Sequence, residues 1–154
     1  MNAIRQCVAL ALAFVLLAGC TTPLPRATPA EFAAYEGKVS LQAVSAERVV
    51  YQLKRLENKP FAELAFWQVA LKERLLKAGY VLATEGVIEA SGHKGYYMET
   101  TAPRGTADYM YLVALFVQDK HLIVIESTGE IKAYKAQREK IFAAIRAGDL
   151  AGGR

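Results

Sequence analysis

The chain of 154 residues has a formal net charge of +4, with 22% charged and 53% hydrophobic residues. This balance is typical of a folded globular protein and excludes a disordered or fibrous chain. The positive charges are spread along the chain without a block of like charges, so we expect no nucleic-acid partner. The length suits a single ordinary domain.

The first twenty residues have the features of a secretory leader. Arg5 supplies a positive charge, and the apolar run Cys7–Ala18 follows it. The run is about a dozen residues long, as in secretory signals. A membrane-spanning helix needs about 20 apolar residues, so this run is too short to cross a bilayer stably.

The segment Leu17-Ala18-Gly19-Cys20 resembles the lipobox of bacterial lipoproteins, with a branched apolar residue and two small residues before the cysteine. The resemblance implies cleavage between Gly19 and Cys20 and lipidation of the Cys20 sulfur. Two or three acyl chains would then anchor the protein in a membrane. Thr21 stands where an Asp favours inner-membrane retention, which implies the periplasmic face of the outer membrane in a Gram-negative cell. An ordinary signal peptide with an incidental cysteine is the alternative.

The sequence therefore predicts four segments. They are a leader over residues 1–19, a lipidated cysteine and linker over 20–35, one globular domain over 36–148 and a flexible tail over 149–154. Three prolines favour an extended spacer in the linker: Pro23, Pro25 and Pro29.

Two short strands and a helix are predicted at the start of the domain. Apolar residues alternate between about Glu36 and Lys54, with a turn near Ser45. Asn58-Lys59-Pro60 then predicts the start of a helix that runs to about Ala78, with Gly79 as its cap. Its apolar residues recur at three- and four-residue steps and are expected to pack on a sheet: Phe61, Leu64, Trp67, Leu71 and Leu75.

Four further strands and a second helix follow. Strands are predicted over 80–90 and 96–101, joined by a glycine-bearing turn over 91–95. The run 108–118 is apolar on both faces and predicts a central strand.

Asp119-Lys120 predicts a tight turn into a strand over 121–127. A last helix is expected over 130–147, with Tyr134, Ile141 and Ile145 on one apolar face. The order ββ-α-ββββ-α predicts an α+β fold in which two helices pack on an antiparallel sheet of about six strands.

This order resembles the PsbP-like α/β/α sandwich over about residues 38–147, chiefly in the long helix after a hairpin and in the closing segment YLVALFVQDKHLIVIESTG before a helix. The resemblance implies an assembly, stability or interaction factor in place of an enzyme. It carries no functional residue onto this chain.

The sequence shows no catalytic or metal-binding motif. His93 and His121 have no recognisable partner, and no cysteine remains after Cys20, so we predict no metal site and no cofactor. Glu89, Glu99 and Glu126 could form a carboxylate cluster only through the tertiary structure. A hydrolase with dispersed catalytic residues stays open on that basis.

One polar connection is a candidate partner-binding loop. Residues 100–106, with Pro103 and Arg104, are predicted as a loop beside the central strand. The leading hypothesis is a non-catalytic, membrane-anchored extracytoplasmic domain that binds another protein of the cell envelope. The alternative is a lipid- or small-molecule-binding module with an apolar pocket between helix 60–78 and the sheet.

Overall fold

The computed structural model describes residues 27–36, 40–104, 107–148 and 150. The leader and the lipobox with Cys20 lie outside these residues. The described elements follow one another in this order: β1 (Ala33–Glu36), β2 (Ser40–Val44), β3 (Val50–Glu57), α1 (Leu64–Lys77), β4 (Val81–Ala90), β5 (His93–Arg104), β6 (Ala107–Gln118), β7 (His121–Glu130) and α2 (Ile131–Ala147).

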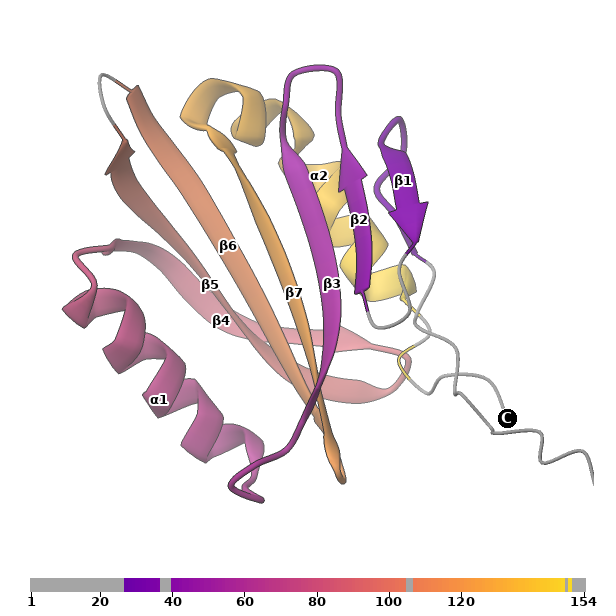
Figure 1. The fold of residues 1–154 in the computed structure, drawn as a ribbon, viewed down its shortest axis with the longest axis vertical. Helices are drawn as coiled ribbons and strands as arrows, with labels where there is room; N and C mark the ends of the chain where they lie inside the picture. The colour runs from indigo at the N-terminus through magenta and orange to yellow at the C-terminus, as the bar shows by residue number, and fades with distance from the viewer. Residues whose placement is uncertain (1–26, 37–39, 105–106, 149, 151–154) are drawn as a thin grey trace, which may run out of the picture.

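The strands form one antiparallel sheet with the order β1-β2-β3-β7-β6-β5-β4. Figure 1 shows the two helices on opposite faces of this twisted sheet, with α1 at the lower left and α2 behind β2 and β3. The predicted α+β fold and the antiparallel pairing are confirmed. The sheet has seven strands, because β1 joins the six that the sequence predicts. No helix of the described residues is long and apolar enough to cross a membrane.

The folded part extends past the predicted boundaries at both ends. Residues 33–35, predicted as linker, belong to β1, which pairs with β2, and Phe32 is buried in the core. Leu150, predicted as tail, is also buried in that core, and its carbonyl accepts a hydrogen bond from Gln118. Phe32, β1 and Leu150 therefore pack with the domain that the sequence predicts over 36–148.

Helix α1 begins at Leu64, later than the predicted start at Pro60. The Asn58 side chain bonds to both the backbone N–H and the carbonyl of Ala62, at 3.2 Å and 2.9 Å. Such local side-chain bonds compete with helical ones, so the chain stays irregular before the helix. Phe61 is consequently 72% exposed, which contradicts its predicted place in the buried stripe.

The predicted turn over 91–95 is shorter in the structure. Only Ser91 and Gly92 connect β4 to β5, both with positive φ, as a two-residue hairpin turn requires. Gly95 lies within β5, where an added Cβ would come within 2.5 Å of the Phe116 ring. Close packing of this ring, and not a turn, requires the glycine. His93, predicted in the turn, is the first residue of β5.

The central strand β6 separates two unequal apolar layers, as its predicted two-faced pattern implies. Met110, Leu112, Ala114 and Phe116 face the α2 side and belong to the main core. The α2 layer is closely packed, since Tyr134, Ile141 and Ile145 are fully buried. In α1, by contrast, Leu75 is the buried residue. The sheet face under α1 is thus less completely filled.

Candidate ligand-binding site

A cavity of about 750 Å³ lies between α1 and the sheet face that α1 covers. The helix wall consists of residues on one face, at three- and four-residue steps: Trp67, Ala70, Leu71, Arg74, Leu75 and Ala78. The sheet wall comes mainly from alternate residues of β3, β6 and β7: Lys54, Leu56, Tyr111, Val113, Leu115, Leu122, Val124 and Glu126. Small-molecule pockets have volumes of about 300–1,000 Å³ and mostly apolar walls with a few polar groups. This cavity therefore has the size and lining of a ligand site, at the place where the sequence suggested one.

The helix leaves this space because its inward face is uneven. Two of the lining residues, Ala70 and Ala78, are too small to reach the sheet, and Leu71 is only half-buried. The larger side chain of Leu75 makes the main buried contact, beside Met98 and Val113. Leu64 and Leu71 pack only partly against the same cluster, so the helix covers the sheet unevenly.

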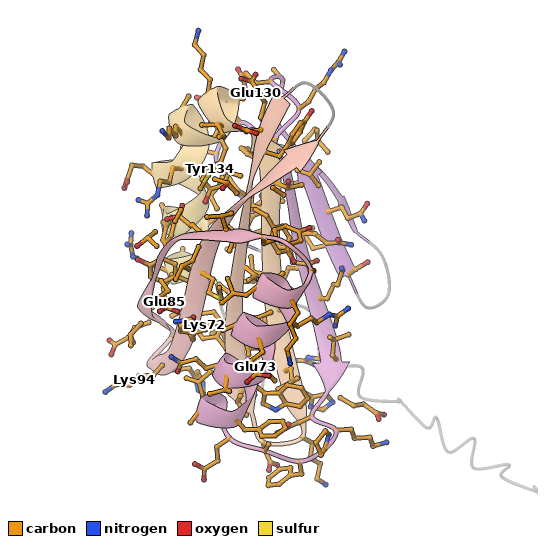
Figure 2. All side chains as sticks on the ribbon, turned by 90° about the vertical axis from the view of Figure 1, so that its left-hand side faces the viewer. Lys72, Glu73, Glu85, Lys94, Glu130 and Tyr134 are labelled. Carbon is orange, nitrogen blue, oxygen red and sulfur yellow. The ribbon has the colours of Figure 1, made fainter. Side chains whose placement is uncertain are left out.

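An ion pair attaches α1 to the β4 side of the sheet. Lys72 Nζ lies 2.5 Å from Glu85 Oε1, and the Tyr96 hydroxyl donates to the other oxygen of that carboxylate. Figure 2 shows Lys72 and Glu85 next to each other at the side of the helix. The hydrogen bond from Lys72, and then that from Tyr96, lowers the pKa of Glu85 below its ordinary value of 4.5. The ion pair between Lys72 and Glu85 therefore persists above pH 4.5, and it is lost as the pH falls through the lowered pKa of Glu85.

Trp67 forms the wall at the N-terminal end of the helix. Its indole Nε1–H donates to Asn58 Oδ1 at 2.8 Å, and the Asn58 Nδ2 donates to the Asp119 carbonyl at 2.9 Å. Asn58 is itself buried, so the ring is held in one orientation against the β6–β7 turn. The prediction that Trp67 is an ordinary core residue is wrong, because the ring is half-buried and lines the cavity.

Polar groups gather toward the C-terminal end of the helix. Glu126 receives Lys54 Nζ at 2.6 Å on one oxygen and the Tyr111 hydroxyl at 2.7 Å on the other. Burial, and then the hydrogen bond to Glu126, raises the pKa of Tyr111, so this hydroxyl stays protonated. The rings of Tyr80 and Tyr111 lie 5.5 Å apart. The cavity therefore has an apolar end and a polar end.

The predicted partner-binding residues do not form a loop. Pro103 and Arg104 belong to the end of β5 and pair with Asp108 and Ala107 of β6. The connection itself, Gly105 and Thr106, lies outside the described residues. The long polar loop expected over 100–106 is therefore wrong, because the ladder between β5 and β6 continues through a sequence that contains proline.

The three carboxylates of the hydrolase hypothesis do not cluster. Glu126 lines the cavity on the α1 side, whereas Glu99 faces α2 on the opposite side of the sheet and Glu89 is exposed on the edge strand β4. Among the described residues, no group of three or more His, Cys, Asp or Glu side chains is placed to hold a metal ion.

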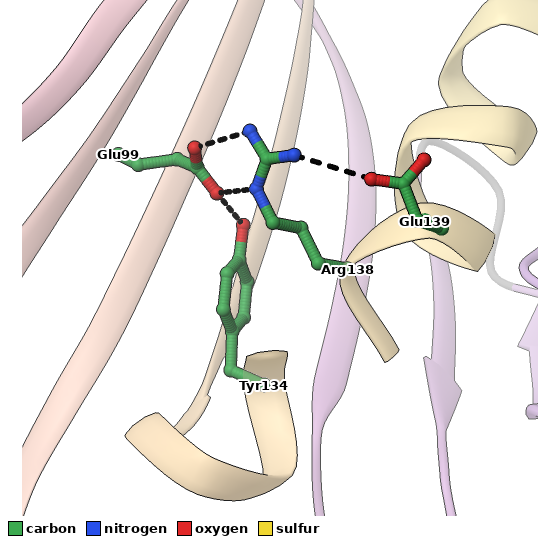
Figure 3. A network of polar contacts seen from close by, with 4 residues as sticks. All are labelled: Glu99, Tyr134, Arg138 and Glu139. Carbon is green, nitrogen blue, oxygen red and sulfur yellow. Dashed lines mark hydrogen bonds and ion pairs between the residues drawn. The ribbon is translucent and has the colours of Figure 1, made fainter. Parts of the chain in front are cut away.

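Glu99 is instead part of a buried network (Figure 3). Its carboxylate is 2% exposed and accepts two hydrogen bonds from Arg138, at 2.8 Å and 2.7 Å, and one from the Tyr134 hydroxyl at 2.7 Å. The hydrogen bond to Glu99 is the main cause that raises the pKa of Arg138. Both carboxylate oxygens are thus committed to contacts that hold α2 on the sheet.

The outer face of α1 exposes apolar side chains. Phe66 is 50% exposed and Val69 is 58% exposed. Leu76 continues this face two turns later, and Phe61 lies just before the helix. In most helices the apolar face is buried and the face toward solvent is polar. Helix α1 differs, because it is apolar both toward the cavity and toward solvent.

The sequence predicts only part of the cavity lining. The sequence shows the apolar stripe of α1, but it does not mark Lys54, Tyr111 or Arg74 as cavity residues. Strand alternation puts Lys54 on the same face as Leu56, yet only the pairing of β3 with β7 brings it to Glu126. The polar end thus depends on contacts between residues far apart in the chain.

No family model matches the sequence, and no curated protein matches it in sequence. Solved structures do match in fold. A Pseudomonas aeruginosa protein of unknown function, PA94, superposes with a TM-score of 0.59 at 12% identity, over 75% of this chain and 94% of that one. The cyanobacterial PsbP protein CyanoP of Synechocystis superposes with a TM-score of 0.52 at 10% identity, over 77% of this chain and 80% of that one. The PsbP-like resemblance is therefore confirmed at the level of the fold alone.

Proposed function

We propose that this chain is a membrane-anchored, extracytoplasmic binding module whose cavity under α1 holds an apolar small molecule or a lipid chain. The observation that supports it is the apolar cavity of about 750 Å³ beside a closely packed core. A protein interior is normally filled to about the density of an organic crystal. The space is a half-open groove walled by Trp67, Leu71 and Leu122, and its largely apolar lining supports an apolar occupant.

The cavity proposal is tested by filling the space from the helix. Ala70 lines the cavity, and the substitution Ala70→Phe places a ring in it. We expect the unaltered domain to bind N-phenylnaphthylamine, an uncharged apolar fluorophore, with increased emission. Ala70→Phe is expected to weaken this binding at least about tenfold, because the ring occupies the ligand's volume. Fluorescence titration measures the change.

The matched control is Ala65→Phe, the same change on the exposed face of the same helix. It should leave the affinity unchanged. Absence of fluorophore binding by the unaltered domain, or equal binding by both variants, would contradict the proposal.

The anchored location is proposed from the lipobox Leu17-Ala18-Gly19-Cys20. In a Gram-negative cell we expect the lipidated protein in the outer membrane, facing the periplasm. The precursor expressed in bacteria fed labelled palmitate should carry the label, and Cys20→Ser should abolish labelling and release the protein from the membrane fraction. The cysteine thiol is the group that accepts the lipid, so serine cannot replace it. An unlabelled natural chain, or unchanged fractionation of Cys20→Ser, would refute the anchor.

An envelope protein partner is the second candidate. It is supported by the exposed apolar face of α1, with Phe66, Val69 and Leu76, since such patches are typical of interaction surfaces. This face is distinct from the cavity wall, so a partner and a cavity ligand could bind together. Crosslinking in intact cells distinguishes a protein partner from a small-molecule ligand.

A further inference from the structure

The two ends of the cavity differ in chemistry along its length. Leu56 and Leu122 are paired across β3 and β7 at the apolar end, next to Trp67. The Tyr111 hydroxyl contacts Glu126 of β7, four residues further along that strand than Leu122, which corresponds to about 13 Å. Arg74 lies two helical turns after Trp67 on the same face of α1, about 10 Å along the axis. The cavity thus runs from an apolar end, where Leu56 is 47% exposed, to a polar end at Glu126.

One positive charge at the polar end is not balanced by a carboxylate. Lys54 and Glu126 form an ion pair at 2.6 Å, and the Tyr111 hydroxyl occupies the second oxygen of Glu126. The pair therefore contributes little net charge. Within the part of the chain that the structure describes, Arg74 forms no ion pair with a carboxylate. Arg74 is exposed to solvent and lines the cavity together with Tyr111 and Glu126. Its charge lowers the pKa of Tyr111, against the larger raising effects of burial and of Glu126.

We infer that the cavity binds a single-chain amphiphile with an anionic head group, and that Arg74 binds the head. This inference rests on the proposed function of the cavity. The chain would lie along Trp67, Leu115 and Leu122, where burial of apolar surface is favourable at about 25 cal/mol per Å². The guanidinium presents a planar pair of donors that matches a carboxylate or a phosphate. The unbalanced charge of Arg74 is the complement that an anion requires, and a cationic head would meet repulsion there.

The test compares two probes of equal chain length, dodecanoate and dodecanol, below their aggregation concentrations. Their displacement of N-phenylnaphthylamine from the purified domain gives both affinities. We expect the unaltered domain to prefer dodecanoate. Arg74→Gln should lower the affinity for dodecanoate about tenfold, equivalent to about 1.4 kcal/mol, and leave the affinity for dodecanol unchanged. Arg74→Lys should retain part of the preference, because it keeps the charge without the planar donors.

Lys77→Gln is the matched control, since it removes one positive charge from the same helix outside the cavity lining. It should change neither affinity. Equal affinities of dodecanoate and dodecanol, or equal losses of both in Arg74→Gln, would overturn the assignment of Arg74 while the cavity itself remains a binding site. Binding of neither probe by the unaltered domain would instead refute the proposed function.

Discussion

Replacing Arg138 by alanine is expected to lower the free energy of unfolding by about 3 kcal/mol, the low end for removing one partner of a buried ion pair, because the Arg138 side chain is 34% exposed. The reason is the Glu99 carboxylate, which is 2% exposed and would lose both hydrogen bonds from the guanidinium. The Tyr134 hydroxyl alone would then solvate it. The guanidinium also lies 4.4 Å above the Phe142 ring, so part of the loss is packing. Urea denaturation followed by circular dichroism measures the change.

A control on the same network separates this effect from surface charge. Glu139 contacts Arg138 at 3.4 Å, but its side chain is 84% exposed. Glu139→Ala should therefore change stability by less than about 0.5 kcal/mol. The double variant Glu99→Leu with Arg138→Leu should lose less than the two single leucine variants together, because neither charge is left buried alone. Additive losses would show that the buried pair does not act as a unit.

Ile145→Ala is expected to lower the free energy of unfolding by a similar amount, about 3–4 kcal/mol, within the range of about 2–5 kcal/mol for truncating a buried aliphatic residue. Ile145 is fully buried in the core between α2 and the sheet. The closely packed layer there cannot collapse readily onto the space left behind. Should the alanine variant fail to fold, Ile145→Val is expected to lower the free energy of unfolding by about 1 kcal/mol.

The matched substitution on the other face is Leu71→Ala. Leu71 is only half-buried and borders the cavity, so little additional space is created and less apolar surface returns to water. We therefore expect Leu71→Ala to lower the free energy of unfolding by about 1 kcal/mol. Equal losses for Leu71→Ala and Ile145→Ala would contradict the unequal packing of the two layers.

These predictions follow from an asymmetry that periodicity could not reveal. Both helices were predicted from stripes at three- and four-residue steps, and both exist. However, the stripe of α2 is buried at Tyr134 and Ile141, while that of α1 lines a cavity at Trp67 and Leu71. A stripe indicates which face of a helix turns inward. It does not indicate how closely the sheet approaches that face.

The candidate site was predicted in position but not in composition. One hypothesis from the sequence is an apolar pocket between the first long helix and the sheet, and the structure has a cavity there. The polar end was not predicted, since Lys54 and Glu126 are far apart in the chain and meet only through the β3–β7 ladder. The sequence predicts a helix start at Asn58, whereas in the structure the Asn58 side chain accepts the Trp67 hydrogen bond and orients that ring.

The sequence by itself determined the order of the elements and the antiparallel α+β class, because hydrophobic period and turn chemistry act over neighbouring residues. It also identified the two-faced strand β6, since an uninterrupted apolar run needs cover on both sides. Only the tertiary structure decided that β1 joins the sheet edge, that Glu99 is buried against Arg138, and that Arg74 borders a cavity. Each of these depends on distances between segments remote in the chain, which local spacing does not encode.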